Sequence, residues 1–312
     1  MNNARVCFIG SNQSFIEQDR KLLESLGYDV DQHSFKGNLL SYFLSYSREI
    51  KKAVQDADIV YGWFASCETL PAVYYAKRYG KKSIVVAGGY DTAYVPEIDY
   101  GAFTNIKERI PAKYIFKNAD ITLVVDMSLK KPIMENVGIS GKNIVYLPTG
   151  HDPVFFKPKG EKKDIILTVG NLTESVIKRK GLDVFVRAAK YIPQARFVLI
   201  GNYAEDCYLI DIASSNVEFT GFVPLMDDCS WYQKSRVFCQ LSRYEGLPTA
   251  LCQAMLCECI PVGTKHGVIP TAIGDTGFYV PNGDVEATVE GIQIALNAPH
   301  KNGYLLNSHC QS

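Results

Sequence analysis

Short apolar runs alternate along the chain with longer segments of helical spacing. The first half has six expected strands: Val6–Gly10, Tyr28–Gln32, Ile59–Trp63, Ser83–Ala87, Ile121–Val125 and Ile144–Leu147. Expected helices lie between them, near 14–26, 38–55, 68–79, 102–117 and 128–136. This alternation predicts βαβ units and a parallel sheet with helices on both faces.

A polar segment from Thr149 to Asp164 interrupts the pattern. It holds two prolines, two glycines and four lysines, as expected of a linker. The alternation then restarts with strands at Ile165–Val169, Phe197–Ile200, Val217–Thr220, Val237–Cys239, Ile260–Val262 and Gly277–Val280, and helices near 180–191, 225–234, 249–257 and 285–296. We therefore expect two doubly wound α/β domains, 1–150 and 160–312, that bind a ligand in the cleft between them.

Composition narrows the functional class. The 312 residues have a formal net charge of zero, which disfavours nucleic acid as a partner. None of the nine cysteines forms a C-x-x-C pair, which favours reduced thiols in a cytoplasmic protein. The N-terminus runs directly into a strand pattern, and no apolar run is long enough to span a membrane. These features predict a cytoplasmic location.

Two loops that follow first strands are candidate anion sites. Gly10 allows a tight turn before a helix whose N-terminus can face an anion, although GSNQ is neither a dinucleotide fingerprint nor a P-loop. In the second half a strand ends at Gly170, and we expect the next helix to begin near Lys180. Three cations lie at that expected N-terminus: Lys178, Arg179 and Lys180. Cations are disfavoured there, so they indicate a bound anion such as a diphosphate, the alternative being a solvated basic loop.

The segment SRYEGLPTALCQAM (242–255) is a candidate sugar and phosphate site. Glu245 lies in a turn after a strand, and Gly246 allows close approach to the backbone. Thr249 is a candidate cap for the next helix, with Gln253 one turn further on. A carboxylate and an amide suit sugar hydroxyls, and free N–H groups after Gly246 suit phosphate.

The second half resembles the family-four retaining glycosyltransferases of the GT-B fold. The motifs follow in order: LPTGHDPVFFKP, ILTVGNLTE…KRKGLD, FTGFVP, SRYEGLPTALCQAM and CIPVGTKHGVIPTAIGDTGFYVPNGD. They run from Leu147 to Asp284, and GGYD (88–91) and NADITLVVDMSLKK (118–131) resemble the family more loosely. The resemblance implies two Rossmann-like domains: an acceptor-side domain, 1–150, and a donor-binding domain, 160–312.

Residue roles are implied by the same resemblance. Lys180 matches the lysine that contacts the donor diphosphate, and Glu245 matches the first glutamate of a paired motif that holds the transferred sugar. Gly246 and Leu247 lie where backbone N–H groups meet the phosphates. Gln253 occupies the second glutamate position, which grips the ribose. Gly170, Asn171, Lys178, Arg179 and Thr249 complete the expected donor site.

Four positions depart from the family pattern. Gln253 replaces glutamate, Asn171 stands where many members have arginine, Thr271 replaces a glutamate, and Gly88 stands where many members have histidine. Lys178 and Arg179 are candidates to replace the cation missing at Asn171.

The implied reaction is transfer of a hexosyl group from a nucleoside-diphosphate sugar to a hydroxyl of a glycan, lipid or small molecule, with retention of configuration. The leaving phosphate takes the acceptor proton. No D-x-D-like carboxylate pair is evident, so Lys180 and helix dipoles replace a metal, and we expect no cofactor beyond the donor substrate. The alternatives are a sugar-nucleotide epimerase of the same fold and a non-catalytic sugar-nucleotide-binding protein.

Two further expectations concern the first half. Asp91 is a candidate catalytic residue that contacts the acceptor hydroxyl, with a turn-capping aspartate as the alternative. Peripheral membrane contact is suggested by the apolar segment 39–46 and by the basic helix near 102–117, with a solvated helix face as the alternative. That helix carries Lys107, Arg109, Lys113 and Lys117.

Overall fold

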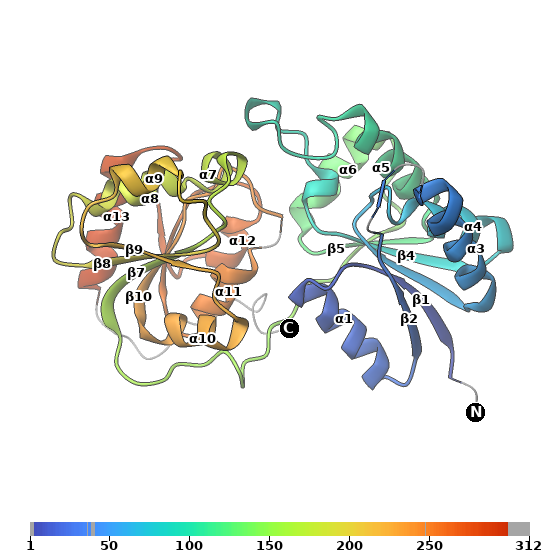
Figure 1. Cartoon of the computed structure of the whole chain (residues 1–312), viewed down its shortest axis with the longest axis horizontal. Coiled ribbons are helices and arrows are strands. Elements are labelled where there is room, and N and C mark those ends of the chain that lie inside the picture. Colours follow the sequence, from blue (N-terminus) through green and yellow to red (C-terminus); the bar gives the residue numbers. More distant parts are fainter. Residues whose placement is uncertain (1–2, 36, 39–40, 247, 299–312) are drawn as a thin grey trace. The chain divides into compact units, whose positions relative to one another are not determined.

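The computed structural model describes residues 3–35, 37–38, 41–246 and 248–298. The chain divides into two compact units, Met1–Pro148 (unit 1) and Thr149–Ser312 (unit 2). Each unit has one six-stranded parallel sheet flanked by helices (Figure 1). The α/β fold class predicted from the alternating pattern is confirmed.

The sheet of unit 1 has the order β2-β1-β3-β4-β5-β6. Its strands are β1 (Arg5–Ile9), β2 (Asp29–His33), β3 (Ile59–Trp63), β4 (Lys82–Ala87), β5 (Ile121–Val124) and β6 (Ile144–Tyr146). The helices are α1 (Ser14–Ser25), a π-helical turn at Tyr42–Tyr46, α3 (Ser47–Asp56), α4 (Leu70–Tyr79), α5 (Ile106–Asn118) and α6 (Lys130–Val137). Helices α3 to α6 pack side by side, each against the next in sequence. Part of the helix expected at 38–55, residues 39–40, lies outside the described residues.

The sheet of unit 2 has the order β12-β11-β10-β7-β8-β9. Its strands are β7 (Lys163–Val169), β8 (Arg196–Ile200), β9 (Val217–Gly221), β10 (Ser235–Gln240), β11 (Ile260–Gly263) and β12 (Phe278–Tyr279). The helices are α7 (Glu174–Lys180), α8 (Leu182–Ala189), α9 (Tyr208–Ile212), α10 (Leu225–Lys234), α11 (Thr249–Leu256), α12 (Ile269–Ile273) and α13 (Val285–Asn297). The short helices α7, α9 and α12 were not predicted, because each is too brief to show a period.

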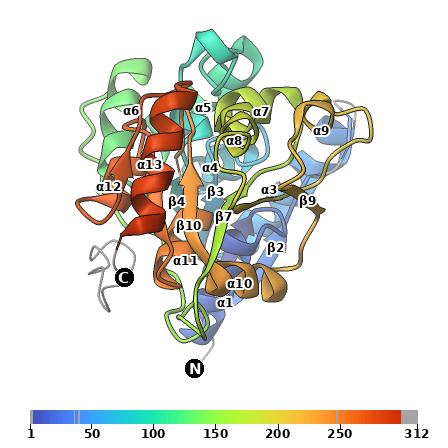
Figure 2. The same ribbon diagram turned by 90° about the vertical axis from the view of Figure 1, so that its left-hand side faces the viewer.

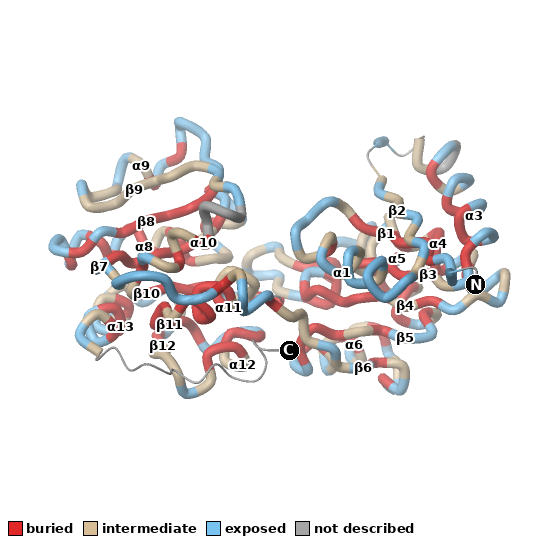
Figure 3. Tube along the Cα trace, turned by 90° about the horizontal axis from the view of Figure 1, so that it is seen from below, coloured by how far each residue is buried: buried red, intermediate tan, exposed pale blue. Residues whose placement is uncertain are grey.

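Alternate residues of the central strands build two separate cores in unit 2. Ile166 and Phe197 face the layer of α8, α9 and α13, whereas Leu167 and Val198 face the layer of α10, α11 and α12. Figure 2 shows α8 and α13 together on one side of this sheet. The central strands of both sheets are buried (Figure 3), which explains their nearly continuous apolar runs. No helix within the described part of the chain is long and apolar enough to cross a membrane.

Candidate functional site

The strand order of unit 2 brings two loops together. From β7 the chain connects to β8 and then β9 on one side, while β10, β11 and β12 lie on the other. Strands β7 and β10 are neighbours, but their connections leave in opposite directions. Such a switch point opens a crevice at the carboxyl ends of the two strands, where α/β sheets bind ligands. The loops after β7 and β10, far apart in sequence, meet at this switch point.

The loop after β7 leads into two helices rather than one. Helix α7 ends at Lys180, because Gly181 has φ +63° and α8 begins at the next residue. A Cβ at Gly181 would lie 2.6 Å from the carbonyl oxygen of Leu241, so the glycine also lets α8 start close to the loop after β10. Gly170, at the end of β7, likewise leaves room for the Lys180 side chain, whose Cδ would lie 2.8 Å from a Cβ there.

One expectation about this segment is wrong. The three cations were expected at a helix N-terminus, but Lys178, Arg179 and Lys180 form the last turn of α7. The negative end of a helix dipole favours cations, so their position alone does not require an anion. The stop signal is Gly181, which lies inside the segment 180–191 that was expected to form one helix.

An ion cluster joins α7 to the loop after β10. Oε1 of Glu245 lies 3.0 Å from Nη1 of Arg179 and 3.3 Å from Nζ of Lys180. The same oxygen accepts hydrogen bonds from Ser242 Oγ at 2.9 Å and from Gln240 Nε2 at 3.2 Å. Glu245 is buried, at 7% exposure, so two cations and two neutral donors replace water as partners of this carboxylate.

The charges of the cluster keep Glu245 ionised. Burial by itself would raise the pKa of Glu245, but the charges of Lys180 and Arg179, together with the hydrogen bonds from Ser242 and Lys180, outweigh it and hold the pKa below its ordinary value. Within the described part of this cluster, one carboxylate faces two cations, which leaves these three side chains with a net charge of plus one. An anionic ligand can complement that charge.

The remaining cation of α7 points elsewhere. Lys178 is exposed and forms a 2.7 Å ion pair with Glu174, one turn earlier in the same helix. Asn171 is also exposed, and its Oδ1 accepts a hydrogen bond from the backbone N–H of Asn202, which links the loops after β7 and β8. The structure therefore brings Arg179 and Lys180 to Glu245, but not Lys178.

Helix α11 continues directly from the Glu245 loop. Its first residue is Thr249, while Pro248 occupies the N-cap position without a side-chain hydrogen bond, so the expected cap at Thr249 is wrong. Gln253, one turn in, is 7% exposed. Gly246 is buried beside Glu245, and Leu247 lies outside the described residues.

The sequence analysis did not identify the buried residues that hold Glu245 and its loop in place. Ser242 and Gln240 are buried polar side chains at the end of β10, and Thr264 Oγ1 donates to the Ser242 carbonyl at 2.5 Å. Gly267 has φ +57°, and a Cβ there would lie 2.5 Å from the Glu245 carbonyl oxygen. A polar residue at the end of an otherwise apolar strand, as at Gln240, was the available signal.

The two candidate residues of unit 1 have structural roles. Gly10 follows β1, and a Cβ there would lie 2.6 Å from the Ile16 side chain, so the glycine permits close packing of α1. Asp91 is 2% exposed, and its two oxygens accept the backbone N–H groups of Ala65 at 2.9 Å and Gly89 at 3.0 Å. This geometry matches the turn-capping alternative for Asp91. Burial raises the pKa of Asp91 to about 6, although these hydrogen bonds oppose the rise.

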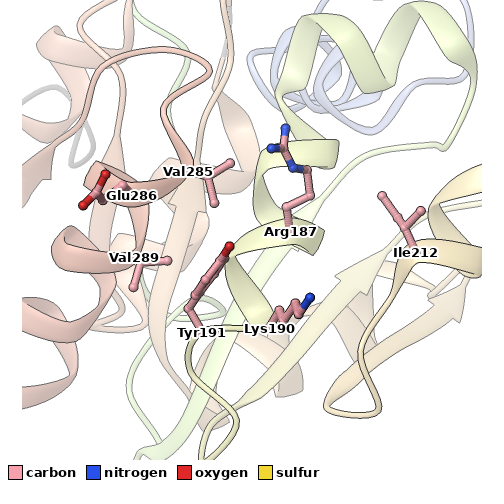
Figure 4. A pocket seen from close by; sticks show the side chains of 7 residues that line it. All are labelled: Arg187, Lys190, Tyr191, Ile212, Val285, Glu286 and Val289. Atoms are coloured by element: carbon pink, nitrogen blue, oxygen red, sulfur yellow. The ribbon is translucent and has the colours of Figure 1, made fainter.

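A pocket of about 660 Å³ lies apart from these residues (Figure 4). It is formed by the end of α8, the end of α9 and the start of α13. Its lining consists of Arg187, Lys190, Tyr191, Ile212, Val285, Glu286 and Val289. None of the predicted site residues lines it. Among the described residues, no group of three or more His, Cys, Asp or Glu side chains is placed to hold a metal ion.

Comparison with known proteins finds a family similarity within unit 2. Residues 163–298 match the family model described as "Glycosyl transferases group 1", which agrees with the glycosyltransferase resemblance of the motifs. A curated relative, one of the subunits of phosphatidylinositol N-acetylglucosaminyltransferase from Arabidopsis thaliana, is 25% identical over 195 residues, which cover 58% of this chain and 43% of the relative. The match to an uncharacterized glycosyltransferase of Haemophilus influenzae covers 40% of that protein, so the chain spans less than half the length of these relatives.

Solved structures share the fold over almost the whole chain. Sucrose-phosphate synthase from Thermosynechococcus elongatus has a TM-score of 0.75 at 15% identity, covering 95% of this chain and 90% of that one. HepE of Anabaena, in complex with UDP and glucose, has a TM-score of 0.73 at 14% identity with the same coverage. An epimerase, UDP-GlcNAc 2-epimerase of Methanocaldococcus jannaschii, has a TM-score of 0.63 at 11% identity, covering 96% and 94%. The fold alone therefore does not separate transferase from epimerase.

Proposed function

We propose, from the match of residues 163–298 to glycosyl transferases group 1, that this protein transfers a sugar from a nucleoside-diphosphate donor to a hydroxyl acceptor with retention of configuration. The observation that carries the proposal is the cluster of Arg179, Lys180 and Glu245 at the switch point of unit 2. It offers excess positive charge for a diphosphate and a carboxylate for sugar hydroxyls within one site. The UDP and glucose bound by HepE, a protein of the same fold, support a nucleotide-sugar donor.

The donor diphosphate takes the place of Glu245 beside the cations in this mechanism. Lys180 and Arg179 neutralise the phosphate oxygens, and Glu245, released from one ion pair, accepts a hydrogen bond from a hydroxyl of the sugar. The first N–H groups of α11 have no acceptor within the helix, so they can donate hydrogen bonds to a phosphate. Gln253 lies on the same helix, where its amide can bond to the ribose hydroxyls.

The reaction breaks one bond and forms one bond at the anomeric carbon. The bond to the diphosphate oxygen breaks as the acceptor oxygen approaches from the same face. The acceptor proton moves to the departing phosphate oxygen, which gives a glycoside and a nucleoside diphosphate. Negative charge grows on the diphosphate during this step, and Lys180 and Arg179 stabilise it without a metal ion.

Arg179 supplies the cation that Asn171 lacks in this proposal. The family pattern has arginine at position 171, in the loop after β7, whereas the guanidinium here comes from the last turn of α7. Arg179 Nη1 also donates to the Tyr244 carbonyl at 3.2 Å, which fixes the guanidinium beside Glu245. The proposed site therefore has the same number of cations as the family pattern.

A membrane surface is the proposed location of the acceptor side. Along α5, Ile106 and Ile110 are exposed one turn apart, at 53% and 61%. Lys107, Arg109 and Lys117 are exposed on the same helix. Apolar residues flanked by cations on an exposed helix suit an anionic lipid interface.

Turnover of purified protein tests the proposed reaction. Nucleoside diphosphates are first screened one base at a time by thermal shift, and the matching labelled nucleotide sugar is then used as donor. Lys180→Ala should reduce transfer about 30- to 1000-fold, whereas the exposed Lys178→Ala is the matched control and should remain active. Lys180→Arg should recover part of the loss.

Three results would count against the proposal. Donor binding without turnover would favour the non-catalytic alternative, and release of an epimerised nucleotide sugar would favour the epimerase. Activity that is lost in EDTA and restored by a divalent ion would contradict metal independence.

A further inference from the structure

The sheet of unit 1 has its own switch point. In the order β2-β1-β3-β4-β5-β6, β1 connects outward to β2, whereas β3 begins the series that runs the other way. A crevice is expected at the carboxyl ends of β1 and β3. Phe15, in the first turn of the helix that follows β1, and Phe64, directly after β3, have their rings in edge contact there, with centroids 6.2 Å apart.

Phe64 has a backbone conformation that aromatic residues rarely adopt. Its φ is +65°, in the left-handed region. Hydrogen bonds on both sides hold it there: its N–H donates to Val86 at 2.9 Å, and its carbonyl accepts from Ser66 at 3.0 Å. The next N–H, of Ala65, donates to Asp91 at 2.9 Å. Asp91 thus fixes the turn that carries Phe64.

The strained backbone places the Phe64 ring over the end of β4. A side chain at Gly88 would clash with this ring, so the ring fills the space that such a side chain would occupy. The ring is half-buried and also contacts Trp63, with centroids 5.6 Å apart. Phe15 is half-buried as well. Two aromatic rings therefore remain partly open to solvent at the switch point.

The strain itself argues for a role of the ring. Glycine would adopt this φ without cost, so a bulky residue here means that the fold accepts a penalty to keep an aromatic side chain at this place. The rings carry no charge and suit a neutral ligand with an apolar face, unlike the cations of unit 2. A pyranose ring has such a face, formed by its C–H groups.

We propose that Phe64, positioned by Asp91, forms with Phe15 the floor of the acceptor subsite and stacks against a pyranose ring of the acceptor. This inference rests on the proposed function and names the acceptor class for it. Asp91 is then a positioning residue, because it acts on the acceptor through Phe64 rather than by contact.

Binding of simple sugars can be followed through Trp63. The chain has two tryptophans, so Trp231→Phe leaves Trp63, which contacts both Phe15 and Phe64, as the single reporter. Methyl pyranosides of the gluco, manno, galacto and N-acetylgluco series serve as probes. We expect at least one of them to change Trp63 emission, and Phe64→Gly to weaken its binding about tenfold or more. Phe64→Tyr should retain binding.

Two controls separate stacking from a structural role. Asp99 also has a left-handed φ, of +48°, and is exposed in the same unit, so Asp99→Gly places glycine at a second left-handed position and should leave binding unchanged. Asp91→Asn should weaken binding in the parent but add nothing in Phe64→Gly, because its effect passes through that ring.

The proposal is overturned if no pyranoside alters Trp63 emission, or if Phe64→Gly gains thermal stability and still binds the sugar as before. Additive effects of Asp91→Asn and Phe64→Gly would overturn the positioning role. Transfer from the nucleotide sugar is measured separately. Sugar binding without turnover would contradict the proposed function and leave the subsite standing.

Discussion

Glu245→Gln is the substitution that tests the charge balance of the proposed donor site most directly. It keeps the shape of the side chain and removes the one negative charge that Arg179 and Lys180 share. Both cations contact the same oxygen, at 3.0 and 3.3 Å, so their nitrogens lie no more than about 6.3 Å apart. At an effective dielectric constant of about 20 their mutual repulsion is then at least about 2.6 kcal/mol.

The expected loss of stability follows from this geometry. Breaking a buried ion pair costs about 3–5 kcal/mol. The Arg179 and Lys180 side chains remain 14% and 18% exposed, so solvent screens part of the effect. We expect Glu245→Gln to lose about 2–4 kcal/mol, which lowers Tm by roughly 5–15 °C.

Anion binding should change in the opposite direction. With the carboxylate gone, a diphosphate meets two cations whose charge Glu245 no longer offsets, and pyrophosphate should bind Glu245→Gln about tenfold or more tightly than the parent at low salt. Transfer should nevertheless fall, because the sugar hydroxyl loses its acceptor.

Thermal melts with and without pyrophosphate measure both effects. Lys178→Ala is the control, since its exposed pair with Glu174 includes no residue of the cluster, and its Tm should match the parent. The reasoning is refuted if Glu245→Gln melts like the parent and gains no additional stabilisation from pyrophosphate.

Three other changes test separate features. Gly181→Ala should destabilise unit 2 by about 1–3 kcal/mol in urea melts, because φ is +63° and the new Cβ would lie 2.6 Å from the Leu241 carbonyl; an unchanged midpoint would contradict this. Burial raises the pKa of Asp91 from 3.8 to about 6, so the folded state binds this proton more tightly than the unfolded state. The free energy of unfolding should therefore fall by up to about 3 kcal/mol as pH rises from 4 to 6. Asp91→Asn should remove that slope in urea melts across this range. Ile106→Ser with Ile110→Ser should abolish flotation with anionic liposomes at low salt, and a parent that never floats would exclude the membrane contact.

The fold could be predicted from the sequence because its signals are local. Each buried strand is a continuous apolar run, and the order of strands and helices fixes parallel sheets with few alternatives. Short helices carry no such signal. The run ESVIKRK forms one helix, and only the left-handed Gly181 separates it from the next. Missing that stop moved the three cations from the end of one helix to the start of another.

The candidate site could be predicted in its chemistry but not in its contacts. The charge of Lys180 and the carboxylate of Glu245 are visible as residues, whereas their distance depends on which strands are neighbours. The pairing of β7 with β10 joins positions more than sixty residues apart, which no local pattern reports. The same limit applies to Asp91, whose capping of Ala65 depends on the adjacency of β3 and β4.

The departure from the family pattern at Asn171 can be explained by comparing the positive charges at the site rather than the residue at each position. Asn171, in the loop after β7, accepts a hydrogen bond from the Asn202 N–H, which links two loops but supplies no charge. In our proposal, Arg179 supplies that charge from the last turn of α7, and Glu245 balances one of the two positive charges while no donor is bound. A site assembled at a switch point tolerates such an exchange, because the loop and the helix end reach the same crevice. Substitution of Arg179 should therefore impair donor binding as much as substitution of Lys180, although only Lys180 occupies a position of the family motif.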